Sequence, residues 1–301
     1  MGRGGGAGEG PADRAAGGVP RAWLRAVTGA GRLRTALPAP SLRAAVLETA
    51  WITTHLALYP AGLLRERLPR RERYGLAGLP PVQRGLWVGD VEAAGRPILL
   101  VHGMADNRAI FTVLTRGLRK RGFQHVVSVY YPPTTNDIRA AARRLSTEVE
   151  ALVAGSGHER IHLVSHSLGG VIARYYVQRL GGDRRVDTLV TLGTPHGGTL
   201  VAHLLPLQLG RQLRPGSDLI RELAEPAPGC RTRFMVYWSA LDQLVIPPQN
   251  ALLDHPDLHA HNVQVHGVGH MSLPIHGRLV HEISALLSRP GAMDHSFSTG
   301  A

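Results

Sequence analysis

The sequence predicts an α/β fold with a mostly parallel central sheet and helices on both of its faces. From residue 84 onward, short apolar runs alternate with helix-like stretches, which is the pattern of strand–helix–strand units. The runs Ile161–Val164 and Thr188–Leu192 are largely apolar and contain β-branched residues, as strands buried on both faces require. With 301 residues, 44% of them apolar, the chain is long enough for one such domain with its own core.

The expected elements follow one another at regular spacing. Strands are expected at residues 85–91, 98–101, 125–130, 161–164, 188–192, 233–238 and 263–266, and helices at 107–121, 136–153, 168–180 and 274–287. Right-handed crossovers would place these helices on the two faces of the sheet. This main domain is expected to span residues 84–290, with a short leucine-rich cap at about 197–229.

The two ends of the chain have a different character. Residues 1–40 are rich in glycine and arginine and show no apolar period, which predicts a disordered tail. Residues 41–73 contain the largely apolar run Ala44–Leu64, whose polar members fall mostly on one side of a helix. This predicts an amphipathic helical segment that packs on the main domain, lies on a membrane surface or spans a membrane. A flexible tail is expected at 291–301.

Charge and cysteine content exclude several classes of protein. The net charge of +12 comes from 34 basic and 22 acidic residues, and residues 1–73 hold 12 arginines against 5 acids. Only one basic residue is a lysine, a bias that we ascribe to codon composition, so no nucleic-acid partner is expected. The single cysteine, Cys230, excludes an intramolecular disulfide framework and a cysteine-based zinc cluster.

The first residues lack the pattern of a secretory signal peptide, which favours a cytoplasmic or membrane-associated location while export stays open.

A candidate nucleophile lies where the strand at 161–164 passes into the next helix. The stretch SHSLGG places Ser167 at a tight strand-to-helix turn, which pushes the middle side chain out above the sheet edge. Such a turn needs small residues two positions before and after the nucleophile, and Ser165 and Gly169 hold these positions. Serine thus replaces the first glycine of the usual pattern Gly-x-Ser-x-Gly. The alternative is a serine that only caps a helix.

An oxyanion hole needs two backbone N–H groups that converge on one oxygen. One would come from Leu168, directly after the nucleophile and at the positive end of its helix. The second would come from the loop after the strand at 98–101, where Met104 is the best candidate and Gly103 allows a close approach to the substrate. The alternative is that His102-Gly103 only ends the strand in a turn.

A histidine and an aspartate follow two later strands. His270 lies in a glycine-bracketed loop, from which a mobile imidazole can reach back to Ser167. Asp242 follows the strand at 233–238 and would orient that imidazole and stabilise its protonated form. His266 is the alternative base, expected to be buried or to face a neighbouring strand. The weaker candidates for the acid are Asp254, Asp257 and Asp218. Among the other histidines, His102 is expected to be structural and to bond its own loop, His166 to lie on the far side of the turn from the nucleophile oxygen, and His196 to shape the pocket rim.

Taken in order, five stretches resemble lipases of the α/β-hydrolase superfamily over about residues 85–288: LLVHGM, LVSHSLGG, TLGTPHGGT, YWSALDQLVIP and NVQVHGVGHMSL. The likeness is strongest to small bacterial triacylglycerol lipases and esterases, and looser to lipase-like hydrolases that deacylate lipid anchors. It implies the α/β-hydrolase fold, a triad of Ser167, Asp242 and His270 in that chain order, and an oxyanion hole of Met104 and Leu168. It also implies that no metal and no organic cofactor is used.

The expected function is that of a serine carboxylic-ester hydrolase, a lipase or esterase that works through an acyl-enzyme. The expected substrates are lipid or acylglycerol esters or small acyl esters. The leucines of the cap would then hold an acyl chain, or they only pack on the sheet. The alternatives are an acyltransferase, thioesterase or amidase on the same fold, and a non-catalytic membrane-associated module.

Overall fold

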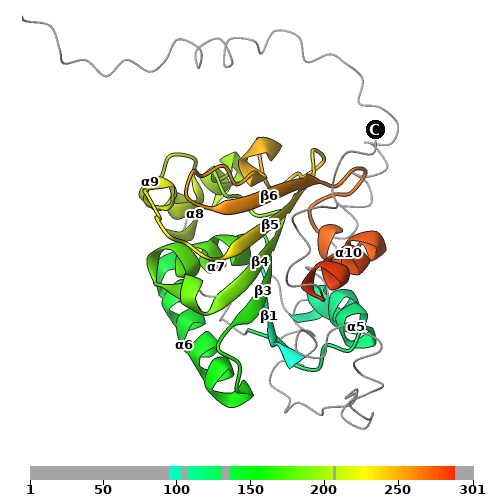
Figure 1. Cartoon of the computed structure of the whole chain (residues 1–301). Coiled ribbons are helices and arrows are strands. Elements are labelled where there is room, and N and C mark those ends of the chain that lie inside the picture. The colour runs from blue at the N-terminus through cyan, green and yellow to red at the C-terminus, as the bar shows by residue number, and fades with distance from the viewer. Residues whose placement is uncertain (1–94, 104–107, 130–135, 206–207, 289–301) are drawn as a thin grey trace, which may run out of the picture. The chain divides into compact units, whose positions relative to one another are not determined.

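A six-stranded parallel sheet forms the centre of the part of the chain that the structure describes (Figure 1). The strands lie in the order β2-β1-β3-β4-β5-β6. Their bounds are β1 Ile98–Val101, β2 Val126–Ser128, β3 Ile161–His166, β4 Val186–Leu192, β5 Arg233–Trp238 and β6 His259–Gln264. The chain runs outward from β1 to β2 and returns to β3 on the other side of β1. Ligands of open parallel sheets bind at such a reversal, beyond the carboxyl ends of the strands.

Helices cover both faces of this sheet, as Figure 1 shows. The helices α5 (Thr112–Lys120) and α10 (Gly277–Leu287) pack together on one face. The helices α6 (Ile138–Ser156) and α7 (Leu168–Arg179) pack together on the other. The shorter α8 (Gln208–Leu213) and α9 (Asp218–Ala224) follow β4, and α9 contacts α7. Five short 3-10 turns complete the described elements: η2 Arg108–Phe111, η3 Gly182–Arg184, η4 Leu200–Leu204, η5 Pro248–Ala251 and η6 Leu273–Ile275.

The core consists of two layers, one on each face of the sheet. Successive residues of β1 alternate between them: Ile98 and Leu100 belong to the layer under α5 and α10, and Leu99 and Val101 to the layer under α6 and α7. All four side chains are buried. Burial on both faces explains why the central strands are largely apolar in sequence, and the predicted α/β arrangement is confirmed.

The structure corrects the position of the last strand. It was expected at 263–266, whereas β6 runs from His259 to Gln264. Because β6 lies at the edge of the described sheet, most of its residues are exposed and polar, and it lacks the apolar signature of a central strand.

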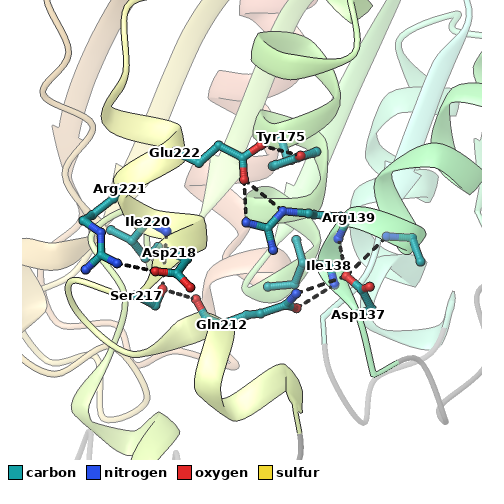
Figure 2. A network of polar contacts seen from close by, with 11 residues as sticks. Asp137, Ile138, Arg139, Tyr175, Gln212, Ser217, Asp218, Ile220, Arg221 and Glu222 are labelled. Carbon is teal, nitrogen blue, oxygen red and sulfur yellow. Dashed lines mark hydrogen bonds and ion pairs between the residues drawn. The ribbon is translucent and has the colours of Figure 1, made fainter.

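The segment at 197–229 is fastened to the helices of one face (Figure 2). Gln212 of α8 accepts a hydrogen bond from the backbone N–H of Ile138 at 2.8 Å and donates to Asp137 at 3.1 Å. Glu222 of α9 accepts from Arg139 at 2.9 Å and from the hydroxyl of Tyr175 at 2.6 Å. The buried leucines of α8 and α9 belong to the core layer that also contains residues of α6 and α7: Leu209, Leu213, Leu219 and Leu223. These leucines therefore pack on the domain, whereas Leu200 and Leu204 of η4 are exposed.

The structure describes residues 95–103, 108–129, 136–205 and 208–288. The tail predicted at 1–40, the helical segment at 41–73, the strand at 85–91 and the tail at 291–301 lie outside the described residues. Within the described ranges, no helix is both long enough and apolar enough to cross a membrane.

Candidate active site

Ser167 has a backbone conformation that sets it apart from its neighbours. Its φ is 55° and its ψ is −127°, and among the described residues it is the single non-glycine residue with a positive φ. It lies between the last residue of β3, His166, and the first residue of α7, Leu168, both of which are buried while Ser167 is partly exposed. Such a conformation costs about 1–3 kcal/mol and persists only where the surrounding structure enforces it. The turn thus presents the Ser167 side chain at the carboxyl edge of the sheet.

Two glycines after Ser167 allow the close packing that enforces this turn. A Cβ atom on Gly169 would lie 2.4 Å from the carbonyl oxygen of Val101, at the end of β1. A Cβ atom on Gly170 would lie 1.9 Å from the hydroxyl oxygen of Thr194, in the loop after β4. The backbone N–H of Ser167 also donates to the carbonyl of Leu192 at 2.9 Å. Helix α7 therefore begins against the ends of both β1 and β4.

Ser165 fills the position where the usual pattern has glycine. Its side chain is buried, and its hydroxyl donates to the carbonyl oxygen of Val190 in β4 at 2.9 Å. The hydroxyl is thus satisfied within the sheet, which explains how serine fits at this point of the turn.

The end of β1 reaches the candidate nucleophile. A Cβ atom on Gly103 would lie 3.0 Å from the Cβ of Ser167, so only glycine fits there without displacing a neighbour. The ring of His102 donates from Nδ1 to the carbonyl of Gly103 at 3.0 Å, the contact with its own loop that a structural role predicts. Leu168 is the first residue of α7, and the first N–H groups of a helix have no acceptor inside it. Met104 lies outside the described residues.

Asp242 and His270 form a buried pair. The imidazole Nδ1 of His270 donates to Oδ2 of Asp242 at 2.7 Å, and the two side chains are 1% and 0% exposed. The other carboxylate oxygen, Oδ1, accepts from the backbone N–H groups of Leu244 and Val245, each at 2.8 Å. These bonds fix the carboxylate, and the tautomer that they assign to His270 leaves Nε2 as its proton-accepting nitrogen.

Gly193, at the end of β4, lies against this pair. Its φ is 55°, and a Cβ atom there would lie 3.0 Å from Oδ2 of Asp242 and 3.1 Å from Nδ1 of His270. Its backbone N–H donates to the carbonyl of Tyr237 in β5 at 2.9 Å. The position requires glycine for both its conformation and its surroundings. Sequence reasoning missed this role, although the motif TLGTPHGGT contains the residue.

The other predicted candidates lie elsewhere, and two expectations about them are wrong. His266 is exposed beyond the end of β6, because the strand stops at Gln264 and the chain turns at Gly267. His196 is buried rather than at a rim, since its ring contacts the hydroxyl of Thr191 at 3.1 Å. The weaker acid candidates have other partners or are exposed: Asp218 pairs with Arg221, Asp257 accepts from the backbone of Ala227, and Asp254 is exposed.

Burial and nearby charge suppress protonation of His196. Desolvation, followed by the positive charge of Arg174, lowers the pKa of His196 well below its usual value. The Arg174 guanidinium is itself buried and donates to the carbonyls of His196 at 3.1 Å and Leu223 at 2.8 Å. Burial, followed by the charge of Arg179, lowers its pKa to about 9. A buried cation thus joins α7, the loop after β4 and the end of α9.

No group of three or more histidine, cysteine, aspartate or glutamate side chains in the described ranges is arranged to hold a metal ion. The parallel sheet instead collects Gly103, Ser167, Gly193, Asp242 and His270 at one edge, each after the carboxyl end of a strand. His166 links two of these groups, because its ring centroid lies 4.8 Å from that of His270 while its backbone adjoins Ser167. A serine hydroxyl, an imidazole and a carboxylate are the groups that acyl transfer by a serine nucleophile uses.

Comparison with known proteins finds similarity to lipases and to a thioesterase family. The family model for palmitoyl protein thioesterase matches residues 97–225. A triacylglycerol lipase of Vibrio cholerae is 32% identical over 114 residues, which cover 36% of this chain and 35% of the relative. A triacylglycerol lipase of Pseudomonas fragi is 28% identical over 167 residues, 52% of this chain and 51% of the relative. The chain thus matches about a third to a half of the length of these curated relatives.

Solved structures of lipases share the fold. Aspergillus fumigatus lipase B superimposes with a TM-score of 0.57 at 17% identity, covering 66% of this chain and 55% of that protein. The mature form of Bacillus licheniformis lipase BlEst2 gives a TM-score of 0.54 at 17% identity, covering 65% and 92%. The protein therefore has the α/β-hydrolase fold, and the predicted resemblance to α/β-hydrolase lipases is confirmed.

Proposed function

We propose that this protein is a serine carboxylic-ester hydrolase that cleaves acyl esters, with lipid or acylglycerol esters as its substrates. The observation that carries the proposal is a strained, partly exposed serine at the sheet edge that also holds a buried histidine–aspartate pair. The triacylglycerol lipases among its relatives support the substrate class.

In the proposed mechanism, Ser167 attacks the carbonyl carbon of the ester. His270 accepts the proton of the Ser167 hydroxyl on Nε2 while its Nδ1–H stays bonded to Asp242. The buried carboxylate stabilises the imidazolium that forms, and its two backbone bonds keep it from turning away. His270 then returns the proton to the leaving alcohol, which leaves an acyl group on Ser167.

The negative charge of the tetrahedral intermediate needs N–H donors. We propose the backbone N–H of Leu168 as one donor, because it begins α7 and lies at the positive end of the helix dipole. The second would be Met104, in the loop after β1, as the sequence predicts. A good donor of this kind contributes about 3–4 kcal/mol to the stability of the transition state.

Hydrolysis of the acyl-enzyme completes the cycle. A water molecule gives a proton to His270 and attacks the acyl carbon; His270 then returns that proton to the Ser167 oxygen as its bond to the acyl carbon breaks, which releases the acid and restores Ser167. A thiol leaving group would pass through the same acyl-enzyme. The match to the palmitoyl protein thioesterase model therefore makes thioester cleavage the second candidate.

The segment at 197–229 is the proposed cap of this site. Its helices α8 and α9 are fastened to α6 and α7, and their leucines are buried in the core, so they are not available to a substrate. We therefore assign the acyl chain to the exposed leucines of η4, Leu200 and Leu204.

The test compares the purified protein with Ser167→Ala on p-nitrophenyl esters from acetate to palmitate and on a palmitoyl thioester. Ser156→Ala, in the last turn of α6, is the matched control. We expect ester hydrolysis to vanish in Ser167→Ala and to persist in the control. A fluorophosphonate should label Ser167 covalently in wild type and in the control. Unchanged hydrolysis in Ser167→Ala would overturn the proposal, and a thioester rate far above every ester rate would replace it with the second candidate.

A further inference from the structure

His166 is in contact with the loop that carries the proposed base. It is the last residue of β3, its side chain is 1% exposed, and its Nε2 lies 3.2 Å from the carbonyl oxygen of His270. A carbonyl can only accept, so His166 donates through Nε2–H. The two imidazole rings also touch, with centroids 4.8 Å apart and an interplanar angle of 47°. His166 thus holds both the backbone and the ring of His270.

The loop around His270 needs such a support. It follows the edge strand β6 and contains Gly267, whose φ is 70°, and Gly269, so its backbone has many accessible conformations. The hydroxyl of Ser239, after β5, donates to the carbonyl of Val268 at 2.5 Å and anchors one side of the loop. The bond from His166 anchors the carbonyl two residues further on. Between them these contacts restrict the backbone from which the His270 imidazole extends.

The ring of His270 is then held from two directions. Asp242 binds Nδ1 at 2.7 Å and sets the hydrogen-bonding direction of the ring, while the ring of His166 packs against it. His166 and Ser167 are consecutive residues, so the support of the base and the nucleophile share one rigid backbone. A displacement of β3 would move both groups together.

We propose that His166 is a positioning residue, which holds the imidazole of His270 in line with Ser167 through the bond to the His270 carbonyl and through ring contact. This inference rests on the proposed function. It assigns to His166 no proton transfer, because its Nε2–H is directed at a carbonyl. A side chain that positions the base acts on the chemical step, so its loss lowers kcat and leaves KM nearly unchanged.

The experiment uses two variants of the full chain, His166→Met and His166→Gln. Methionine has a similar length and no donor, whereas the glutamine amide can still donate to the carbonyl of His270. We expect His166→Met to lower kcat about 100-fold, the loss that a displacement of about 1 Å causes. We expect His166→Gln to recover most of this loss, and KM to change less than twofold in both.

His255→Met is the matched control. His255 is also a buried histidine, and its Nε2 binds the carbonyl of Glu225 at 2.9 Å, but it precedes β6 at the amino edge of the sheet. We expect His255→Met to lower Tm about as much as His166→Met does and to keep the kcat of the wild type. If His255→Met lowers kcat as much as His166→Met does, the effect is one of general stability and the proposal fails.

A proton NMR measurement keeps this test separate from the proposed function. The His270 Nδ1–H that binds Asp242 should give an exchange-protected downfield signal in wild type and His166→Gln, and the signal should be lost or broadened in His166→Met. An unchanged signal with unchanged kcat in His166→Met would overturn the positioning role. If wild type shows neither hydrolysis nor fluorophosphonate labelling, the proposed function fails, while the signal still reports whether His166 orients the ring.

Discussion

Replacing Gly193 with alanine is expected to disable the Asp242–His270 pair and leave the protein folded. The added Cβ would lie 3.0 Å from Oδ2 of Asp242 and 3.1 Å from Nδ1 of His270, the two atoms joined by the 2.7 Å hydrogen bond. Ordinary contacts of a Cβ atom begin at about 3.4 Å, so the pair has to give way by a few tenths of an ångström. The methyl group therefore acts directly on the atoms that orient the base.

Two separate costs follow from this substitution. The φ of 55° lies in the left-handed region, where an L-residue loses about 1–2 kcal/mol of stability. The displaced imidazole adds a catalytic loss; a misplacement of 1 Å costs about 100-fold in kcat, and the smaller shift here should cost less than that. Gly229→Ala separates the two costs, because Gly229 has a φ of 74° and nothing within 4 Å of the added Cβ.

The assay combines ester hydrolysis with urea denaturation. Both variants should lose about 1–2 kcal/mol of unfolding free energy, and Gly193→Ala alone should lose kcat. Wild-type kcat in Gly193→Ala would refute the reasoning, since the base would then tolerate a methyl group against both of its hydrogen-bonding atoms. An equal loss of kcat in Gly229→Ala would refute it as well.

Three further substitutions test other parts of the structure. Asp242→Asn should lower kcat about 10⁴-fold at neutral pH, because an amide favours the wrong tautomer of His270; ester hydrolysis measures it. Arg174→Met should cost about 1–3 kcal/mol in urea denaturation, because the buried carbonyl of His196 loses the Arg174 donor and that of Leu223 keeps only Gln178. Burial, followed by the charges of Arg96 and Arg233, lowers the pKa of His162 to about 3 although Asp187 opposes this. The unfolded chain binds a proton at this histidine below about pH 6.5 and the folded protein does not, so stability should fall between pH 6.5 and 3 by up to about 1.4 kcal/mol per pH unit. Urea denaturation at several pH values gives the free energy of unfolding as a function of pH. This free energy should fall less steeply with decreasing pH in His162→Leu than in wild type.

The controls for these substitutions come from exposed positions. Asp254→Asn should keep wild-type kcat, and Arg221→Met, on the outer side of α9, should change stability less than Arg174→Met does. A large kcat loss in Asp254→Asn would contradict the assignment of Asp242. If the free energy of unfolding of His162→Leu changes with pH as steeply as that of the wild type, other groups dominate acid unfolding.

Local sequence predicted most of the described strands and the turn that carries the candidate nucleophile. The turn at Ser167 could be predicted because the small residues that it needs, Ser165 and Gly169, lie only two positions away in the chain. The proximity of Asp242 and His270 could also be predicted, because parallel strands end at one edge of a sheet and the loops that follow them meet there. These inferences depend on spacing and on residue type, which a sequence displays directly.

Only the tertiary structure decided which residues touch. The contacts of Gly193 with the Asp242–His270 pair and of His166 with His270 join residues far apart in the chain. The exposure of β6 depends on its place at the edge of the described sheet. The sequence alone determined the period of the elements and the chemistry of the turn, because both depend on neighbours in the chain. The packing of loops at the sheet edge depends on distances in space, and these exist only once the strands are paired.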